Sequence, residues 1–441
     1  MRLGTASVIR GNARTLPLPD DSVDLIVTSP PYFALRSYQD GGEHYAGQIG
    51  SEPTPQEFLD ALIECTREWV RVLKPSGSLF VNLGDKYAGG GGQWDKDERE
   101  LGFSSASRNT STGGKTFGFR RKSLMGLPWR YAIRCVDDLG LILRAEVIWS
   151  KPNGLPESVT DRVRRSHEQW FHFTLQPRYF SAVDEIREAQ QSVGERHEGR
   201  SGWVNAAGKA GGDEVTRGFT TRALNPLGKL PGSVWTVPTE PLRVPESLGI
   251  DHFAAFPTEW PKRIVQGWSP GGICTACGEG RRPVVAAQRC IDGYPADIGA
   301  RKIGGYQSEP SGIGNWRVTT EREHLGYACA CQAPTIQEQV TEFDYGTGST
   351  VERTVEVPDP AWRPTAPTRP AVVLDPFGGT GTTAMVAKAL GRHGISVDLS
   401  ADYCRLAEWR TNDRDQLAKV LGVGKAEQQP AEQLDLFGGA L

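Results

Sequence analysis

The sequence predicts an α/β fold built around a layered, mostly parallel β-sheet. Short β-rich runs alternate along the chain with segments whose apolar residues recur at helical spacing. A strand, a glycine-rich turn and a helix also follow one another late in the chain, an arrangement typical of such folds. The strand-sized runs are Val23–Val27, Ser78–Leu83, Ala145–Trp149, Ala371–Leu374 and Gly394–Val397.

The clearest predicted helix, Thr54–Leu73, lies between the first two strands. Its apolar positions recur three or four residues apart, as at Phe58, Leu62 and Trp69, and the sequence KPSG that follows is a suitable helix stop. A second helical run, Ala384–Leu390, follows the glycine-rich turn. Each helix therefore connects two predicted strands, as parallel pairing requires.

With 38% hydrophobic and 23% charged residues, the composition is typical of a globular protein. The apolar runs are too short to span a membrane, and no apolar signal-peptide region follows the first residues. We therefore expect a cytoplasmic protein without membrane association.

The formal net charge of −3 conceals two basic segments. Residues 115–134 carry six basic side chains and no carboxylate, and Arg162, Arg164 and Arg165 form a second group. Contact with nucleic-acid phosphates needs a local positive patch and not a high overall pI. A solvated surface explains the same charges equally well, so charge alone leaves both interpretations open.

Three long segments do not fit a compact sheet domain. Residues 87–119 are rich in Gly and Ser and are expected to form a mobile loop, and residues 185–229 are polar and glycine-rich. Residues 270–369 hold two close cysteine pairs and end in a proline-rich linker. The last segment separates two parts of one predicted sheet domain.

The glycine-rich turn has the sequence DPFGGTGTT, residues 375–383. Between a strand and a helix, such a turn presents backbone N–H groups to a ligand. It lacks the lysine of a P-loop and the G-x-G-x-x-G order of a dinucleotide fold. The next strand ends in Asp398, an acid suited to ribose hydroxyls. Together they indicate an adenosine-type ligand, with a purely structural turn as the alternative.

The stretch VTSPPY, residues 27–32, ends the first strand with a rigid, polar corner. An exocyclic amine on a nucleobase is a poor nucleophile, because its lone pair is delocalised into the ring. The Ser29 hydroxyl and the Pro30 carbonyl offer two acceptors to its two N–H bonds, and Tyr32 can stack on an extruded base. Positioning and electrostatics would then supply the rate. Without its surroundings, a proline pair after a strand is more often only a loop.

Together these motifs resemble the DNA amino-methyltransferases that use S-adenosylmethionine, in the circularly permuted class whose catalytic motif precedes the cofactor motif. The resemblance implies a Rossmann-like methyltransferase fold, S-adenosyl-L-methionine as cofactor and double-stranded DNA as substrate. The segments that carry it, about half of the chain, are residues 16–32, 73–85, 145–153, 164–180, 252–265 and 373–400.

The same resemblance implies roles for single residues. The implied catalytic residues are Ser29, Pro30, Pro31 and Tyr32. The implied cofactor-binding residues are Asn12, Phe256, Pro257, Asp375, Pro376, Phe377, Gly378, Gly379, Thr380, Gly381, Thr382, Thr383 and Asp398. Asn12 departs from the family, which commonly has an aspartate after the glycine at this point.

The resemblance also divides the chain. We expect a catalytic half, a target-recognition region, a short cofactor-side motif, a cysteine-rich zinc-binding insertion with a linker, a cofactor-binding half and a flexible tail. In that order these are residues 1–180, 181–250, 251–269, 270–369, 370–422 and 423–441. The insertion, which parts the two cofactor motifs, is a second departure from the family.

The motifs indicate the methylated base less directly than they indicate the family. The resemblance implies that SPPY more often marks methylation of cytosine N4, and DPPY or NPPY that of adenine N6. We therefore expect cytosine N4, with adenine N6 as the alternative. A cytosine-C5 enzyme is disfavoured because the chain has no Pro-Cys dipeptide. More distant alternatives are methylation of RNA or of a protein glutamine, and a non-catalytic, zinc-stabilised DNA-binding protein.

Four of the eight cysteines form two close pairs, Cys274 with Cys277 and Cys329 with Cys331. Four thiolates can hold a structural zinc ion, although the pairs are far apart in sequence, and Cys290 and His324 are substitute ligands. Unrelated buried cysteines are the alternative. A catalytic zinc is disfavoured because methyl transfer needs no activated water. We expect core positions for the three cysteines in apolar helical contexts, Cys65, Cys135 and Cys404.

The polar C-terminal tail contains one apolar stretch, Gln433, Leu434, Asp435, Leu436 and Phe437. This stretch looks like the short peptides that dock on the bacterial replication sliding clamp. A disordered tail could insert its two terminal apolar side chains into a groove, with the glutamine as polar anchor. Folding back onto the core is the alternative.

Overall fold

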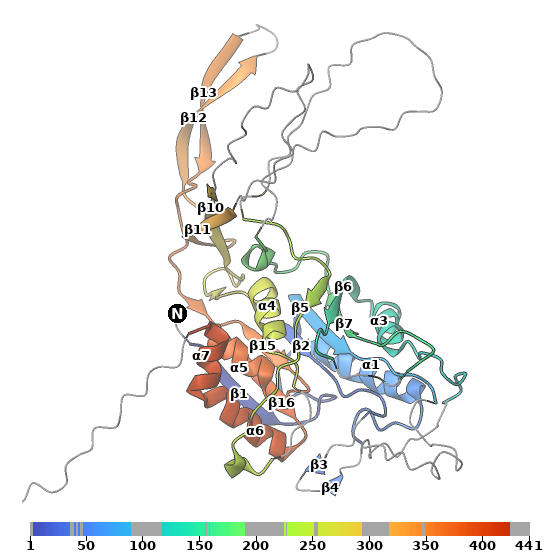
Figure 1. Cartoon of the computed structure of the whole chain (residues 1–441). Coiled ribbons are helices and arrows are strands. Elements are labelled where there is room, and N and C mark those ends of the chain that lie inside the picture. Colours follow the sequence, from blue (N-terminus) through green and yellow to red (C-terminus); the bar gives the residue numbers. More distant parts are fainter. Residues whose placement is uncertain are drawn as a thin grey trace, which may run out of the picture.

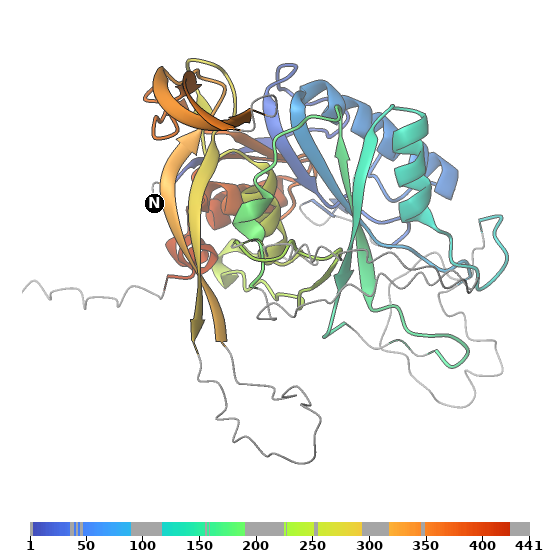
Figure 2. The same cartoon turned by 90° about the horizontal axis from the view of Figure 1, so that it is seen from above.

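The protein is described from a computed structural model (Figures 1 and 2). The structure describes residues 3–35, 39–40, 43–44, 47–89, 117–154, 157, 159–189, 225, 227–250, 255–292, 317–344 and 349–423. Most of the expected loop 87–119, much of the expected recognition region and residues 424–441 therefore lie outside the described residues.

An eight-stranded sheet forms the centre of the molecule, in the order β1-β16-β15-β2-β5-β7-β6-β8. Among these strands, only β7 runs against its neighbours β5 and β6, and every other adjacent pair is parallel. The strands are β1 (Thr5–Arg10), β2 (Val23–Thr28), β5 (Leu73–Leu83), β6 (Ile142–Ser150), β7 (His167–Thr174), β8 (Val234–Thr236), β15 (Val372–Asp375) and β16 (His393–Asp398).

One face of the sheet is covered by α1 (Pro55–Val72) and α3 (Leu127–Asp137). Helix α1 begins where expected, because Thr54 caps it: the Thr54 hydroxyl accepts from the Glu57 amide and the Glu57 carboxylate accepts from the Thr54 amide. The helix ends one residue early, since Leu73 already belongs to β5.

The opposite face is covered by α4 (Glu259–Trp268), α5 (Thr382–Ala389) and α7 (Arg414–Leu421), with α6 (Ala401–Asn412) beside α5 (Figure 1). Leu25 and Val27 of β2 point into this second core, while Ile26 points into the first. Burial on both faces explains why β2 is apolar throughout and not alternating. The described chain also has the short helices η1 (Val183–Ile186) and η2 (Glu246–Leu248).

The cysteine-rich segment leaves and re-enters the sheet domain through one short strand pair, β9 (Ile273–Cys274) with β14 (Thr368–Arg369). Beyond this pair lie two antiparallel ribbons. The ribbon of β12 (Thr335–Asp344) with β13 (Ser349–Pro358) extends away from the sheet domain, whereas that of β10 (Arg282–Asp292) with β11 (Arg317–Ala328) lies next to it (Figure 1). A further short pair joins β3 (Gln39–Asp40) and β4 (Glu43–His44).

The predicted α/β fold with a mostly parallel sheet is confirmed, and each of the five expected strands is present. The expected core cysteines Cys65, Cys135 and Cys404 are buried in α1, α3 and α6. Among the described residues, no helix is both long and apolar enough to cross a membrane.

Candidate active site

A cavity of about 710 Å³ opens at the carboxyl ends of the central strands. It lies where the sheet order reverses: β15 leads through α5 to β16 on one side, and β2 leads through α1 to β5 on the other. The two crossover helices cover opposite faces, so the strand ends between them leave a crevice. Ligands of open α/β sheets bind at such a position.

The four residues of the proline corner, Ser29, Pro30, Pro31 and Tyr32, all line this cavity. The Ser29 hydroxyl donates to Oδ1 of Asn82 over 3.2 Å, and the Tyr32 hydroxyl contacts the same oxygen at 2.7 Å. The Tyr32 ring lies against Gly84, where any Cβ would come within 2.5 Å of it. The corner is therefore fixed by the end of the neighbouring strand β5.

Three polar residues that the sequence left without a role complete this wall: Asn82, Lys151 and Glu168. Nδ2 of Asn82 donates to the Gln169 carbonyl over 3.0 Å, which orients its other amide atom toward the corner. The Glu168 carboxylate lies 2.8 Å from the Tyr32 hydroxyl and 2.5 Å from Nζ of Lys151. All three lie at the end of a sheet strand or next to one. This position is the signal in the sequence that could have identified them.

The glycine loop forms the opposite wall, and its shape demands glycine. A Cβ on Gly378 would lie 1.9 Å from Oγ of Ser396, and Gly379 has a φ of +49°. The Gly379 amide donates to the Asp398 carboxylate over 2.8 Å. Asp398, at the end of β16, is thereby held at the cavity wall beside the loop.

Asp375 lies beneath this loop and not on the cavity wall. Its carboxylate accepts from the Thr383 hydroxyl at 2.9 Å and from the Phe377 amide at 3.1 Å. Complete burial raises the pKa of Asp375 to about 7, although these hydrogen bonds oppose the shift. The residue thus ties the loop to its helix.

Most of the predicted cofactor-binding residues meet at the cavity, but not all. Those that line it are Asn12, Phe256, Pro376, Phe377, Gly378, Gly379, Thr380, Thr382 and Asp398. Four others, Pro257, Asp375, Gly381 and Thr383, lie behind the wall. Oδ1 of Asn12 accepts from the Arg14 amide over 3.0 Å.

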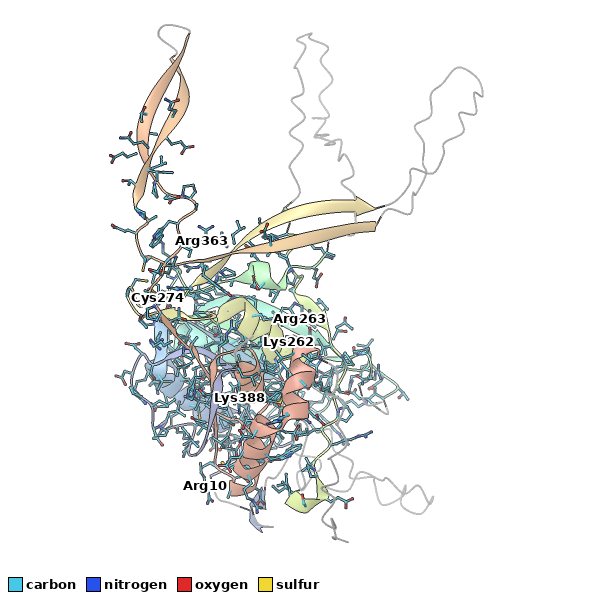
Figure 3. The ribbon with its side chains drawn as sticks, turned by 90° about the vertical axis from the view of Figure 1, so that its left-hand side faces the viewer. Arg10, Lys262, Arg263, Cys274, Arg363 and Lys388 are labelled. Atoms are coloured by element: carbon cyan, nitrogen blue, oxygen red, sulfur yellow. The ribbon has the colours of Figure 1, made fainter. Side chains whose placement is uncertain are left out.

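The four predicted metal ligands also come together, at the base of the insertion. The sulfur atoms of Cys274, Cys277, Cys329 and Cys331 all lie within 4.8 Å of one another. In Figure 3 the labelled Cys274 stands where the ribbons meet the sheet domain. The backbone amides of Cys277 and Ala276 hydrogen-bond to the Cys274 sulfur and lower the pKa of that thiol to about 6. This donor set fits a tetrahedral thiophilic ion such as zinc.

The sequence model of a family described as DNA methylase matches residues 23–274 and 368–409. These segments make up more than half of the chain, and the protein therefore belongs to this family of amino-methyltransferases. The expected family of amino-methyltransferases, with S-adenosylmethionine as cofactor, is confirmed. Residues 275–367 of the insertion lie between the two matched segments.

Two relatives in sequence agree with this assignment. The Type II methyltransferase M.SmaI of Serratia marcescens is 38% identical over 189 residues, which are 42% of this chain and 61% of that protein. M.Cfr9I of Citrobacter freundii, also a Type II methyltransferase, is 37% identical over 230 residues, covering 51% and 72%. Among solved structures, the cytosine-N4-specific PvuII DNA methyltransferase aligns over 96% of this chain and 93% of its own, with 14% identity and a TM-score of 0.47.

Proposed function

We propose that the protein transfers the methyl group of S-adenosylmethionine to the exocyclic N4 amine of a cytosine flipped out of duplex DNA. One observation carries this proposal. The proline corner and the glycine loop, which are far apart in sequence, face each other across a single cavity. An amine held at the corner would thus meet a methyl donor held at the loop.

The corner is suited to an amine with two N–H bonds. The Ser29 hydroxyl gives its proton to Asn82, so its lone pairs are left to accept from the base. The Pro30 carbonyl would be the second acceptor, and the following proline limits its freedom. Two acceptors on one amine draw its lone pair out of conjugation and toward the methyl group.

The opposite wall fits an adenosine-type cofactor. Asp398 presents a carboxylate to ribose hydroxyls, and Pro376, Phe377, Gly378 and Gly379 of the loop line the cavity beside it. The loop can pack directly against Ser396 of β16 because Gly378 has no Cβ. When bound there, S-adenosylmethionine would supply an electrophilic methyl group on sulfur, displaced as the new N–C bond forms.

The methylated amine must then lose one proton. Within the described wall, Glu168 is the carboxylate in hydrogen-bond contact with the corner, through the Tyr32 hydroxyl. Nζ of Lys151 lies 2.5 Å from the same carboxylate and fixes its position beside Tyr32. We assign Glu168 and Tyr32 to the path by which this proton leaves.

Cytosine is favoured over adenine by two features of the same wall. The residue before the proline pair is Ser29, which resembles the cytosine-N4 pattern. Lys151 also lines the cavity and is a pure hydrogen-bond donor, as the cytosine O2 carbonyl requires; adenine has a C–H at the corresponding edge. Adenine N6 is the alternative.

The decisive experiment measures which base is methylated. Duplex DNA is incubated with the protein and labelled cofactor, digested, and its nucleosides are separated by mass spectrometry, with RNA as a parallel substrate. We expect N4-methylcytosine in DNA, lost in Ser29→Ala and retained in the exposed control Ser51→Ala. N6-methyladenine would establish the alternative base, and normal methylation by Ser29→Ala would refute the role of the serine.

For the insertion we propose a structural zinc ion held by Cys274, Cys277, Cys329 and Cys331. The Gly278 amide donates to the Cys274 carbonyl over 2.9 Å, and Gly278 has a φ of +76°. Residues 274–278 therefore form a tight turn, which holds Cys274 and Cys277 close together. Arg281 lies 3.8 Å from the Cys274 sulfur and offsets the negative charge of four thiolates.

Metal analysis of the purified protein tests the zinc site. We expect one zinc per chain, lost in Cys329→Ser and retained in Cys65→Ala, whose thiol lies in the core of α1. Iron in place of zinc, or a disulfide between any two of the four cysteines, would overturn the assignment.

We further propose that residues 433–437 dock on the replication sliding clamp, which would place methylation close behind replication. These residues lie outside the described ranges, and the proposal rests on their sequence alone. A pull-down with purified clamp should lose binding when Leu436 and Phe437 are both changed to alanine. Equal binding by the two proteins would end the idea.

A further inference from the structure

Arg410 of α6 is a buried cation whose direct partners are hydroxyls. Its side chain is 3% exposed, and Nη1 donates to Oγ1 of Thr380 over 2.9 Å and to Oγ1 of Thr382 over 2.5 Å. Its Nε is buried and has no hydrogen-bond partner among the described residues. Helix α6 reaches this position because Ala407, one turn earlier, packs against Gly381 of the glycine loop.

The positive charge of Arg410 is not neutralised by an ion pair with any described carboxylate. Burial lowers its pKa to about 10, and Glu240 is the acidic neighbour that opposes this shift. Glu240 is itself engaged elsewhere, since its carboxylate pairs with Lys419 and accepts from the Thr258 amide and hydroxyl at 2.8 Å. A buried guanidinium without a counter-charge is costly, so a ligand that brings a negative charge would be bound favourably.

The surroundings of Arg410 connect it to the cofactor wall. Thr380 and Thr382, the two acceptors, line the main cavity, so the guanidinium stands directly behind them. Arg410 and Lys419 also line a smaller hollow of about 200 Å³. That hollow shares Glu240, Pro241, Leu242 and Phe256 with the main cavity.

We propose that Arg410 is the counter-charge for the carboxylate of the methionine half of S-adenosylmethionine. Both threonine hydroxyls accept from the guanidinium, and they also hydrogen-bond to each other over 3.2 Å. One of their two protons is used in that contact, which leaves the other hydroxyl to donate toward a carboxylate in the cavity. The proposal rests on the cofactor site of the proposed function and adds to it a positioning residue from α6.

A pair of ligands tests this role without any DNA. S-adenosylhomocysteine carries the amino-acid carboxylate, whereas 5′-methylthioadenosine has the same adenosine and sulfur but lacks it. By calorimetry, Arg410→Met should weaken S-adenosylhomocysteine roughly ten- to hundredfold, as for loss of a charge-assisted hydrogen bond, and leave methylthioadenosine within about twofold. The matched control is Arg405→Met, an exposed arginine of the same helix that pairs with Asp402.

The outcomes separate the alternatives. Equal weakening of both ligands would make Arg410 a structural brace of the loop and overturn the proposal, as would no change for either ligand. If Arg410→Met does not fold, Arg410→Lys retains the charge on a shorter reach, and only S-adenosylhomocysteine should weaken. A wild-type protein that binds neither ligand would instead refute the cofactor site itself.

Discussion

The methyl-transfer cavity and the base of the insertion are held together in different ways. The cavity lies at the ends of buried strands with a hydrophobic core on each face, and its glycine loop is tied down by the hydrogen bonds of Asp375. The base of the insertion has the short pair β9–β14, a few hydrogen bonds such as that from Thr275 to the Pro367 carbonyl, and four clustered thiols. Core packing therefore fixes the first region, whereas the second would depend on the proposed zinc ion, as small domains without a sufficient core do.

The largest expected effect is the loss of cofactor affinity when the glycine loop of the cavity is distorted. Gly378→Ala places a Cβ 1.9 Å from Oγ of Ser396 and 3.1 Å from its Cα, so the loop must move off β16. We expect cofactor affinity to fall on the order of a hundredfold or more, as when ligand contacts of several kcal/mol are lost. Calorimetry with S-adenosylhomocysteine measures this loss. Gly232→Ala, where no atom lies within 4 Å of the new Cβ, is the matched control and should bind normally.

A smaller effect tests the catalytic wall. Glu168→Gln retains the shape of the side chain but removes the carboxylate beside Tyr32 and Lys151. We expect kcat to fall roughly a hundredfold, the contribution of a positioned proton acceptor, with cofactor affinity unchanged. Single-turnover methylation of an oligonucleotide gives the rate. A normal rate would remove Glu168 from the path of the proton.

Loss of the metal from the thiol cluster should affect the insertion and leave the cavity intact. Zinc removal by a chelator, or Cys277→Ser, should make residues 275–367 cleavable by protease while the sheet domain persists as a resistant fragment. Cofactor affinity should stay within about twofold of the wild-type value, because no thiol lines the cavity. Simultaneous unfolding of both regions would contradict the separation of core and metal.

The last prediction concerns stability and not binding or catalysis, and it depends on the titration of Asp375. Because its folded pKa is raised to about 7, the folded state retains a proton that the unfolded chain releases above about pH 4. Stability therefore falls as pH rises between these values, by at most about 1.4 kcal/mol per unit. Asp375→Asn should remove this slope. Denaturant titrations of both proteins between about pH 5 and about pH 8 measure the difference, in which titrations common to both cancel. Parallel pH dependences would argue against the raised pKa.

The local parts of the fold could be predicted from sequence because each has a local cause. Five β-rich runs and the capped helix at Thr54 are visible as patterns, and the resemblance then supplied the class. The glycine loop was predictable for the same reason, since its glycines and the following Asp398 are close in sequence.

What the sequence did not disclose depends on the order and direction of strands. Glu168 reaches Tyr32 because β7 runs antiparallel beside β5, which no periodicity in either segment indicates. Arg410 reaches the glycine loop from a helix 28 residues beyond Thr382. Asp375 and Pro257 were expected in the cavity wall but lie behind it, since a motif does not specify which of its side chains point inward.

The β9–β14 pair has a consequence for how such a chain can change over time. Cys274 and Thr368 are direct partners across this pair, so the two ends of the insertion are already neighbours. A segment whose ends meet adds little chain-closure entropy to the sheet domain, whatever its length. We therefore expect that the insertion can become longer or shorter, or be replaced by another segment, during evolution without loss of the methyl-transfer site.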